Sequence, residues 1–375
     1  MGAVSVDPGA VHFMARTLEL ARRGAGRTSP NPPVGALLVR DGVIVGEGFH
    51  PAAGEPHAEI FALRAAGERA RGADLYVTLE PCCHQGRTGP CTEALIAAGV
   101  RRVYYGAIDP NPRVAGQGLA RLRAAGIVVE AAPLADECRR LIAPFAKHIN
   151  TGRPYLILKA AMTLDGQLAT SAGESRWISC EESRLLVHRL RDRVDAILTG
   201  SGTVLADDPQ LTVRLPEGGR NPARVVIDGG LRTPVSARVY HATAAGRRLL
   251  VTAADAAGNR REAYACQGVE VLTVPREGAH LDLGAVLDAL GAAGLQSVLV
   301  EAGGTLNGAL LRAGLIDALM LFVAPKLMGG NDGRPLFAGA GVARLADAMR
   351  LDDVRVVQVG ADWLFEGEVG PCSPA

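Results

Sequence analysis

The sequence predicts an α/β protein made of two successive domains. Its 375 residues suit two folded units, because one domain usually contains about 100 to 200 residues. Strand-like and helix-like segments alternate through both halves, as they do where helices connect the strands of a sheet. The stretch Thr151-Gly152-Arg153-Pro154 is rich in residues that interrupt helices and strands. We therefore expect one domain over residues 1–150 and a second over residues 151–375.

The elements of the first half follow from local patterns. Asp7 suits the cap of a helix that starts at Pro8. Two apolar runs at 35–40 and 43–48 are joined by Asp41-Gly42, a dipeptide that tight hairpins prefer. A helix is expected from Pro56. The pattern then predicts strands at 73–80, 101–108 and 127–131, helices at 91–99 and 118–126, and a helical stretch at 134–150.

The second half has the same alternation, with a different ending. A strand at 155–163 and a helix at 181–193 open it. Further strands are expected at 196–200, 223–228, 247–253, 269–274 and 297–303. The last segment, 353–369, contains two β-like runs, which indicate antiparallel strands at the edge of a mostly parallel sheet.

Composition excludes several classes of protein. Hydrophobic residues make up 48% and charged residues 21% of the chain, as in ordinary globular proteins. The net charge is +1, and residues 1–150 carry 17 basic against 14 acidic side chains, so neither half has the charge of a nucleic-acid-binding module. No apolar run approaches the roughly 18 residues of a membrane span. No signal peptide is apparent, and the odd number of cysteines, 7, indicates metal binding in a cytoplasmic protein rather than disulfides.

One set of side chains has the spacing of a zinc site. His57 and Glu59 open a predicted helix, Cys82 follows a strand and Pro81, and Cys91 precedes the next helix. Zinc binds imidazole and thiolate, and a catalytic zinc keeps three protein ligands and a water. Glu59 would then carry protons. The pattern matches the zinc nucleobase-deaminase signature H-x-E followed by P-C-x-x-C, except that eight residues separate the cysteines.

Two other interpretations of these residues remain open. His57 and Glu59 alone are common as surface or capping residues at helix starts. A structural zinc site would take a fourth protein ligand, which Cys83 or His84 offers, but it has no use for Glu59.

Several nearby polar residues are candidates for substrate contacts, each with an ordinary structural alternative. His84 and Arg87 would face a phosphate if their loop folds over the site, or they form a solvated basic loop. The amide of Asn31 suits the edge of a heterocycle, or it belongs to a turn. The segment Asp109-Pro110-Asn111-Pro112 ends a strand, where α/β sheets bind ligands, but such residues also form routine turns.

The second half lacks the usual dinucleotide-binding motif but contains a different candidate phosphate-binding segment. No G-x-G-x-x-G motif follows an early strand in residues 151–375. The segment 297–311 has the pattern of a strand, a glycine-rich turn and a helix, so the backbone amides of Gly303, Gly304, Thr305 and Leu306 could bind a pyrophosphate. The alternative is an ordinary connection whose glycines permit close packing. Lys159, in the strand that opens this half, is a candidate polar group near the reacting centre.

Seven motifs, taken together, resemble one known family. They are HAE at 57–59, TLEPCCHQGRTGPC at 78–91, DPNP at 109–112, LKAAMTLDG at 158–166, GESRWIS at 173–179, TVLADDPQLTVR at 203–214 and VEAGGTLNGALL at 300–311. In this order, over nearly the whole chain, the sequence resembles the bifunctional riboflavin-biosynthesis deaminase/reductases. The resemblance implies an N-terminal cytidine-deaminase-like three-layer domain and a C-terminal dihydrofolate-reductase-like domain.

The resemblance also implies two reactions. The first domain would use zinc to remove the 2-amino group of 2,5-diamino-6-(5-phosphoribosylamino)pyrimidin-4(3H)-one as ammonia. The second would use NADPH to reduce the ribosyl group of that product, giving 5-amino-6-(5-phosphoribitylamino)uracil. The implied partners are small phosphorylated pyrimidines, with no nucleic acid or membrane, in a homo-oligomer.

Carried over by motif, the family assigns roles to individual residues. Zinc falls on His57, Cys82 and Cys91, with Glu59 as general acid and base, while Cys83 is a bystander. The expected NADPH contacts are Ala161, Trp177, Thr203, Asp207, Gly303, Gly304, Thr305, Leu306, Asn307, Gly308 and Ala309. The expected substrate contacts of the reductase are Ser175, Arg191, Leu211, Arg214 and Glu301.

Two rival functions explain less of the chain. A polynucleotide-editing deaminase would need a basic groove and stacking aromatics, whereas aromatic residues make up only 4% of the sequence. That rival also leaves everything after residue 150 unexplained. A zinc-stabilised ligand-binding protein would hold metal without turnover, and ammonia release separates it from an enzyme.

Overall fold

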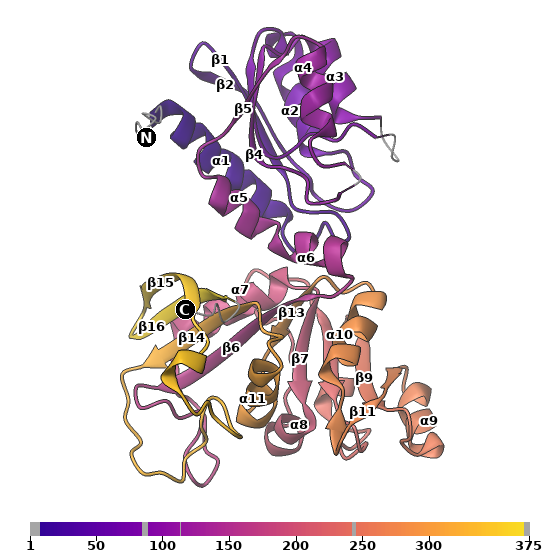
Figure 1. The fold of residues 1–375 in the computed structure, drawn as a ribbon, viewed down its shortest axis with the longest axis vertical. Helices are drawn as coiled ribbons and strands as arrows, with labels where there is room; N and C mark the ends of the chain where they lie inside the picture. The colour runs from indigo at the N-terminus through magenta and orange to yellow at the C-terminus, as the bar shows by residue number, and fades with distance from the viewer. Residues whose placement is uncertain (1–7, 85–88, 113, 242–244, 371–375) are drawn as a thin grey trace. The chain divides into compact units, whose positions relative to one another are not determined.

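The computed structural model describes residues 8–84, 89–112, 114–241 and 245–370 (Figure 1). The chain forms two compact units, Met1–Gly152 and Arg153–Ala375. The division falls two residues beyond the boundary at 150 that the Thr151-Gly152-Arg153-Pro154 segment predicts. Within the described ranges, no helix combines the length and the apolar character that crossing a membrane requires.

The first unit is built on a five-stranded sheet with the order β2-β1-β3-β4-β5. Strand β1 is antiparallel to both β2 and β3, whereas β3, β4 and β5 are parallel. The strands are β1 Gly35–Arg40, β2 Val43–Phe49, β3 Asp74–Leu79, β4 Arg102–Ala107 and β5 Val128–Ala131. The helices are α1 Pro8–Gly24, α2 Ala58–Ala66, the 3₁₀ turn η1 Gly67–Ala70, α3 Cys91–Ala98, α4 Gln117–Ala124, α5 Ala135–Leu141 and α6 Ala143–Thr151.

Helices cover both faces of this sheet and make three layers, as the sequence predicts. Helices α1 and α5 lie on one face and α2, α3 and α4 on the other (Figure 1). Strand β1 shows why its sequence is apolar throughout. Ala36 and Leu38 belong to the core under α2, while Leu37 and Val39 belong to the core under α1. Because both faces of this strand are buried, it does not alternate between apolar and polar residues as a half-exposed strand does.

The second unit is built on a nine-stranded sheet with the order β10-β9-β8-β7-β13-β6-β14-β16-β15. Its strands are parallel from β10 to β14, and β16 and β15 pair antiparallel at one edge. The strands are β6 Tyr155–Thr163, β7 Ala196–Gly200, β8 Ala223–Ile227, β9 Arg248–Ala253, β10 Glu270–Val274, β13 Ser297–Val300, β14 Ala318–Ala324, β15 Leu351–Val359 and β16 Asp362–Val369, with the small pair β11 Arg276–Glu277 and β12 His280–Leu281. The helices are α7 Glu181–Arg193, α8 Ser201–Asp207, α9 Gly258–Cys266, α10 Leu283–Ala292 and α11 Gly304–Arg312, with the 3₁₀ turns η2 Arg238–Tyr240 and η3 Leu345–Asp347.

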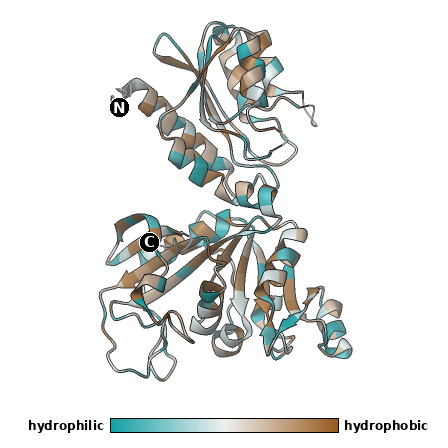
Figure 2. Ribbon diagram, viewed as in Figure 1, coloured by the Kyte–Doolittle hydropathy of each residue, from teal (hydrophilic) through white to brown (hydrophobic). Residues whose placement is uncertain are grey.

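The second sheet is also covered on both faces. Leu198 packs in the core that includes Leu290 of α10 and Leu310 of α11. The preceding residue, Ile197, packs on the opposite face of the sheet, in the core that includes Val204 of α8 and Tyr264 of α9. Figure 2 shows apolar residues concentrated in the central strands of this sheet. Burial on both faces leaves the strand ends and the following turns to carry polar chemistry.

The structure confirms most predicted elements, corrects one, and adds elements that were not predicted: strand β14 and helices α8, α9 and α10. The hairpin at Asp41-Gly42 forms, with φ of 52° and 77° at the two turn residues. The helical stretch predicted at 134–150 is two helices, because Pro144 lacks the N–H that a continuous helix needs and its ring crowds the preceding turn. Strand β14 was missed, although it lies between β6 and β16 where the sheet changes from parallel to antiparallel.

Candidate functional site

Three metal-ligand side chains converge in the first unit. His57 is the residue before α2, Cys82 lies in the loop after β3, and Cys91 is the first residue of α3. The His57 Nδ1 atom lies 3.5 Å from the Cys82 Sγ and 3.4 Å from the Cys91 Sγ. All three donor atoms lie within 4.8 Å of one another. His57 makes no side-chain capping bond to its helix, so its imidazole is available to a metal.

The two sulfur atoms are held as a pair by the start of α3. The backbone N–H of Cys91 donates to the Cys82 Sγ at 3.4 Å, and the N–H of Thr92 donates to the Cys82 carbonyl at 3.1 Å. The hydrogen bond with the Cys91 thiol, together with that of His57, holds the pKa of Cys82 well below its usual value. A thiolate is therefore favoured at Cys82 at neutral pH, and thiolate is the form that binds metal.

Glu59 is buried beside the metal trio of His57, Cys82 and Cys91. Glu59 is only 3% exposed, and its Oε2 atom has no hydrogen-bond partner among the described residues. Burial first, and the charge of Cys82 second, raise the pKa of Glu59 to about 7. A surface or capping role for Glu59 does not fit this burial. A buried carboxyl that changes protonation near neutral pH suits proton transfer.

The donor set fits zinc with three protein ligands. Among the residues that the structure describes, His57, Cys82 and Cys91 form the one cluster with metal-ligand geometry. Neither Cys83 nor His84 belongs to it, although both are described. One imidazole and two thiolates are ligands that zinc prefers, and a three-ligand set is typical of its catalytic sites. Arg87, another candidate in this loop, lies outside the described residues.

Asn31 reaches the metal trio through a histidine that the sequence analysis missed. The Nδ1 atom of His50 donates to the carbonyl of Pro56 at 3.0 Å, so its Nε2 accepts from the Asn31 amide at 3.1 Å. The His50 ring lies 5.4 Å from the ring of His57 between centroids, and His50 is only 2% exposed. His50 directly follows β2, and no spacing pattern in the sequence connected it to His57.

The loop that carries Asp109 and Asn111 is held by the buried carboxylate of Glu80. This side chain accepts backbone hydrogen bonds from Asp109, Gly116, Gly118 and Leu119, at 2.8 to 3.3 Å. Within the loop, the Asn111 N–H donates to the Asp109 Oδ1 at 2.8 Å, which is the turn role considered for this segment. Because Glu80 immediately precedes Pro81 and Cys82, it connects the loop to the metal trio.

The second unit contains a large cavity at the carboxyl ends of its parallel strands. Its volume is about 2110 Å³, and it is lined by residues that follow β6, β7, β8 and β13. This is the edge at which α/β sheets bind ligands. The volume exceeds the roughly 300 to 1,000 Å³ of a typical small-molecule pocket, so it has room for two ligands. All predicted reductase residues except Asn307 and Gly308 line it, together with Lys159.

Asn307 and Gly308 lie on the side of α11 that faces the protein. The Asn307 amide is buried and donates to the carbonyls of Ala302 and Leu336, at 3.3 and 3.2 Å. A Cβ on Gly308 would lie 2.1 Å from the Ala338 carbonyl oxygen. Close packing therefore gives a structural reason for the small residue at 308 and for the position of the Asn307 amide. The expected cofactor contact of these two residues stays a prediction. A Cβ on Gly303, in contrast, would meet nothing closer than Thr203 Oγ1 at 3.9 Å, which leaves the backbone open to a ligand.

A charged cluster lies at the β6 side of the cavity. Arg191 donates to both carboxylate oxygens of Glu301, at 2.7 and 2.9 Å, and to the Thr212 carbonyl at 2.9 Å. Burial alone would raise the pKa of Glu301, but the charge and hydrogen bonds of Arg191, with help from Lys159, lower it to about 2. Burial lowers the pKa of Lys159. The cluster therefore holds a fixed negative charge next to a lysine that loses its proton more readily than a free one.

Arg214 differs from Arg191 in having no carboxylate bound to it in the described structure. Its backbone N–H donates to the His188 Nδ1 at 3.2 Å, and its guanidinium donates only weakly to Thr212 Oγ1 at 3.3 Å. Burial, followed by the charges of Arg191 and Arg214, lowers the pKa of His188 to about 4. Leu211, three residues before Arg214, has φ of 51°, a left-handed value that costs a non-glycine residue energy and that the surrounding contacts must maintain.

Other residues of the cavity were not predicted. His188, Ser201, Arg232 and Arg276 also line it. They lie outside the motifs that carried the resemblance, or at motif edges. Isolated arginines in loops resemble ordinary surface charges in a sequence, and only the fold brings these residues together.

Comparisons with known proteins agree with the two sites. Residues 10–107 match the family model described as the cytidine and deoxycytidylate deaminase zinc-binding region, and residues 154–365 match the RibD C-terminal domain. The riboflavin biosynthesis protein RibD of Escherichia coli K12 is 47% identical over 364 residues, covering 94% of this chain and 97% of the relative. That of Bacillus amyloliquefaciens is 41% identical over 351 residues, covering 94% of each chain.

Solved structures show the same likeness over the whole chain. The structure of Acinetobacter baumannii RibD, form 1, has a TM-score of 0.84 at 40% identity and covers 97% of this chain and 99% of that one. A Thermotoga maritima protein, described as diaminohydroxyphosphoribosylaminopyrimidine deaminase/5-amino-6-(5-phosphoribosylamino)uracil reductase, has a TM-score of 0.81 at 36% identity and covers 96% and 99%. The fold is thus a deaminase-like unit followed by a RibD reductase unit.

The two matched regions correspond to the two sites described above. The first contains the His/Cys/Cys trio of a zinc-binding deaminase, and the second belongs to a reductase family that uses NADPH. Both activities serve riboflavin biosynthesis. The chain belongs to the RibD family of bifunctional riboflavin-biosynthesis deaminase/reductases.

Proposed function

We propose that residues 1–150 form the deaminase domain, with His57, Cys82 and Cys91 as zinc ligands and Glu59 as its general acid and base. The observation that carries this assignment is the buried Oε2 of Glu59, which has no hydrogen-bond partner in the described part of the chain and lies beside three converging ligand atoms. The proposed substrate is 2,5-diamino-6-(5-phosphoribosylamino)pyrimidin-4(3H)-one, which loses its 2-amino group as ammonia.

Each protein group has a distinct task in this reaction. Zinc bound at the trio supplies a Lewis acid that makes water available as hydroxide near neutral pH. Glu59 accepts a proton from the attacking water and delivers it to the leaving amine, which its pKa of about 7 suits. Asn31, oriented by His50, and the Asp109 loop, oriented by Glu80, are placed to bind the pyrimidine. Cys83 remains a bystander outside the metal cluster.

We propose that residues 151–375 form the reductase domain, with NADPH and the phosphorylated deamination product side by side in the cavity. When bound, NADPH would supply a hydride for the ribosyl C1′ of the product, which balances opening of the ring C–O bond and protonation of the released oxygen. The volume of about 2110 Å³ and the open backbone at Gly303 support a dinucleotide there. The proposed cofactor contacts are Ala161, Trp177, Thr203, Asp207, Gly303, Gly304, Thr305, Leu306, Asn307, Gly308 and Ala309.

The charged cluster supplies the polar groups of this reaction. Lys159 and Glu301 both line the cavity, and the lowered pKa of Lys159 suits a group that gives up a proton. Arg191 keeps Glu301 ionised and fixed through two hydrogen bonds. Arg214 is then the arginine available for the sugar phosphate, with Ser175 and Leu211 as further substrate contacts.

We also propose a cytoplasmic homo-oligomer. Two thiol ligands and the other free cysteines suit a reducing compartment. Strand β15 forms the edge of the sheet, and exposed apolar side chains gather on it and on β16: Val354, Val356, Val357, Trp363 and Phe365. Such an edge usually pairs with another chain or is protected, and a second copy of this chain is the proposed occupant. Light scattering on the purified protein measures the oligomeric state.

Separate inactivation of the two sites in the full chain tests the assignment of one reaction to each domain. Glu59→Gln should abolish ammonia release but leave NADPH oxidation with pre-formed deaminated substrate intact. Lys159→Met should give the opposite pattern. If either variant lost both activities while remaining folded, the assignment of separate sites would be wrong.

A further inference from the structure

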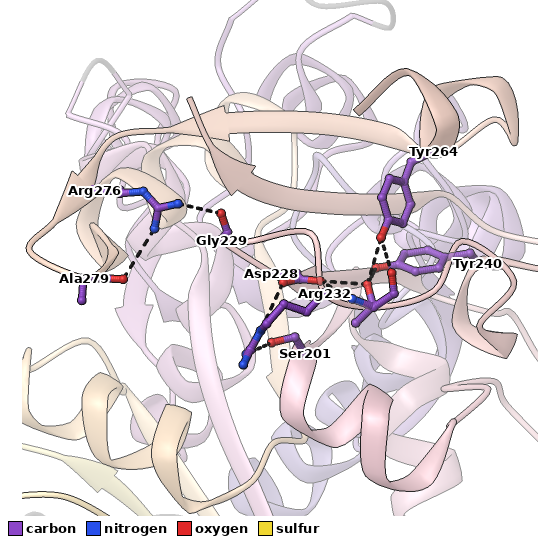
Figure 3. Close-up of polar contacts among 9 residues, drawn as sticks. Ser201, Asp228, Gly229, Arg232, Tyr240, Tyr264, Arg276 and Ala279 are labelled. Carbon is purple, nitrogen blue, oxygen red and sulfur yellow. Dashed lines mark hydrogen bonds and ion pairs between the residues drawn. The ribbon is translucent and has the colours of Figure 1, made fainter. Parts of the chain in front are cut away.

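One end of the reductase cavity carries one hydroxyl and two charged side chains that the proposed chemistry does not use. Ser201 follows β7, Arg232 lies beyond β8, and Arg276 lies in β11, and all three line the cavity. Figure 3 shows Arg232 extending between Asp228 and Ser201, while Arg276 reaches Gly229 and Ala279. Two guanidinium groups at one end of a cavity point to an anionic group of the ligand.

Arg232 is oriented but not neutralised. Its Nη2 atom donates to the Ser201 Oγ at 2.6 Å. Its Nε atom is 3.9 Å from the Asp228 Oδ1, which is an ion pair but too long for a hydrogen bond. The Arg232 side chain is 66% exposed, so much of the guanidinium surface faces the open cavity.

Asp228 directs Arg232 without presenting its own charge to the cavity. Its side chain is fully buried, and its Oδ2 accepts from the N–H and the hydroxyl of Thr233 at 2.7 and 2.9 Å. Its Oδ1 has no hydrogen-bond partner among the described residues, and this oxygen is the one that attracts Arg232. Because the carboxylate is covered, an anion in the cavity meets the guanidinium rather than the acid.

Arg276 is a poorer candidate for the same task. Its Nε atom lies 2.9 and 3.1 Å from the two carboxylate oxygens of Asp255, so its charge already has a partner. Its Nη2 donates to the Gly229 carbonyl at 3.0 Å and thereby fastens the turn that precedes Arg232. Arg276 therefore supports the shape of this end of the cavity, and Arg232 supplies the available charge.

The strand order places Arg232 at the far end of an extended cofactor. Along the sheet, β6 carries Lys159, β13 precedes Gly303, β7 precedes Ser201, and β8 precedes Arg232. Neighbouring strands are about 4.8 Å apart, so β6 and β8 are separated by roughly 14 Å. With the reacting end at Lys159 and the pyrophosphate at Gly303, the adenosine half reaches the turns after β7 and β8.

We propose that Arg232, directed by Asp228 and bonded to Ser201, binds the 2′-phosphate of the cofactor and makes the reductase prefer NADPH to NADH. This inference rests on the proposed reductase function. Arginine presents several N–H donors in a fixed plane that suits phosphate oxygens. The Ser201 hydroxyl accepts from Arg232 and still has its own proton to donate to the phosphate. NADH carries a neutral hydroxyl at this position and gains nothing from the charge.

A binding experiment isolates this contact from the reaction. Calorimetry on the full chain compares adenosine 2′,5′-bisphosphate with adenosine 5′-monophosphate, which differ only in the 2′-phosphate. Loss of a charged hydrogen bond should weaken the bisphosphate about 10- to 100-fold in Arg232→Ala and change the monophosphate less than about twofold. Arg232→Lys should recover part of the loss. The matched control is Arg247→Ala, which removes an exposed arginine paired with Glu270 away from the cavity-lining residues and should change neither.

Steady-state reduction gives the second measurement. The kcat/KM of Arg232→Ala should fall for NADPH by a factor similar to the binding loss and stay nearly constant for NADH, with deamination unchanged. Equal losses for both cofactors, or unchanged bisphosphate binding, would overturn the 2′-phosphate assignment. If the wild-type chain reduced the substrate with neither cofactor, the reductase function itself would be wrong, and that outcome is distinguishable from the first two.

Discussion

Arg191 and Glu301 face each other as a doubly hydrogen-bonded ion pair, with Nε–Oε1 of 2.7 Å and Nη2–Oε2 of 2.9 Å. Arg191 comes from α7 and Glu301 follows β13, so the pair joins segments 110 residues apart. Their side chains are only 11% and 13% exposed. The geometry separates the two arginines that were expected to bind substrate. Arg191 positions a carboxylate, whereas Arg214 has no carboxylate bound to it among the described residues, and we propose that Arg214 binds the phosphate.

Removing the charge of Glu301 should destabilise the second unit. In Glu301→Gln, the buried Arg191 keeps its positive charge without the carboxylate, and breaking such a pair costs about 3 to 5 kcal/mol. Urea unfolding followed by tryptophan fluorescence measures this, since both tryptophans, Trp177 and Trp363, lie in the second unit. Glu270→Gln removes one partner of an exposed ion pair and should cost less than about 1 kcal/mol. Equal effects of the two substitutions would contradict the account.

The ion pair of Arg191 and Glu301 should make the unfolding free energy of the second unit fall at acid pH. Glu301 has a pKa of about 2 in the folded chain, against about 4.3 when unfolded. Its stabilising contribution is therefore complete above about pH 4.3 and is lost as the pH falls toward 2. The difference in unfolding free energy between the wild type and Glu301→Gln should shrink over this interval. A difference that stays constant from pH 5 to pH 2 would show that the pKa of Glu301 is not lowered.

Glu59→Gln should separate metal binding from catalysis. The three ligands remain, so zinc content should stay near that of the wild type, while ammonia release should fall by at least about 100-fold because the proton carrier is gone. Zinc is quantified by mass spectrometry on purified protein, and ammonia by a coupled assay. Ammonia production at the wild-type rate would remove Glu59 from the reaction.

Adjacent cysteines should respond differently to the same substitution. Cys82→Ser should lose zinc, because the Cys82 Sγ lies 3.5 Å from His57 Nδ1 within the ligand cluster. Cys83→Ser should retain zinc, since Cys83 lies outside that cluster. Metal analysis of both variants decides between them, and equal zinc retention would show that the wrong thiol has been assigned.

Arg214→Ala should weaken the phosphorylated substrate more than the cofactor. The loss of a charged hydrogen bond to the sugar phosphate should raise the KM of the substrate about 10- to 100-fold, with a change below about threefold for NADPH. Initial rates with each ligand varied in turn provide the comparison. Losses of similar size for both ligands would indicate that Arg214 shapes the cavity instead of binding the phosphate.

Sequence patterns predicted the strands well because most strands are buried on both faces and are therefore continuously apolar. Strands such as β1 and β7 are buried on both faces, and they appear in the sequence as short continuous apolar runs between turn residues. Strand β14, Ala318–Ala324, has the same character but was missed. The break between α5 and α6 depends on the backbone restriction at Pro144, which a continuous helical pattern conceals.

The first site could be predicted more fully than the second. His57, Glu59, Cys82 and Cys91 belong to residue types that are informative at fixed spacing, and the fold brings the three metal ligands together. His50 and Arg232 have no such spacing, because each acts through neighbours that only the folded chain supplies. Gly308 shows the opposite case: it lies within a ligand-binding motif, yet the nearby Ala338 carbonyl is a sufficient reason for its glycine.

Incubating the purified chain with 2,5-diamino-6-(5-phosphoribosylamino)pyrimidin-4(3H)-one, with and without NADPH, tests most directly whether one polypeptide carries both reactions. Mass spectrometry of the products should show replacement of one amino group by oxygen without cofactor, and a further gain of two hydrogens when NADPH is added. An unchanged substrate in the zinc-loaded protein, or a deaminated product that never gains hydrogen from NADPH, would contradict the account.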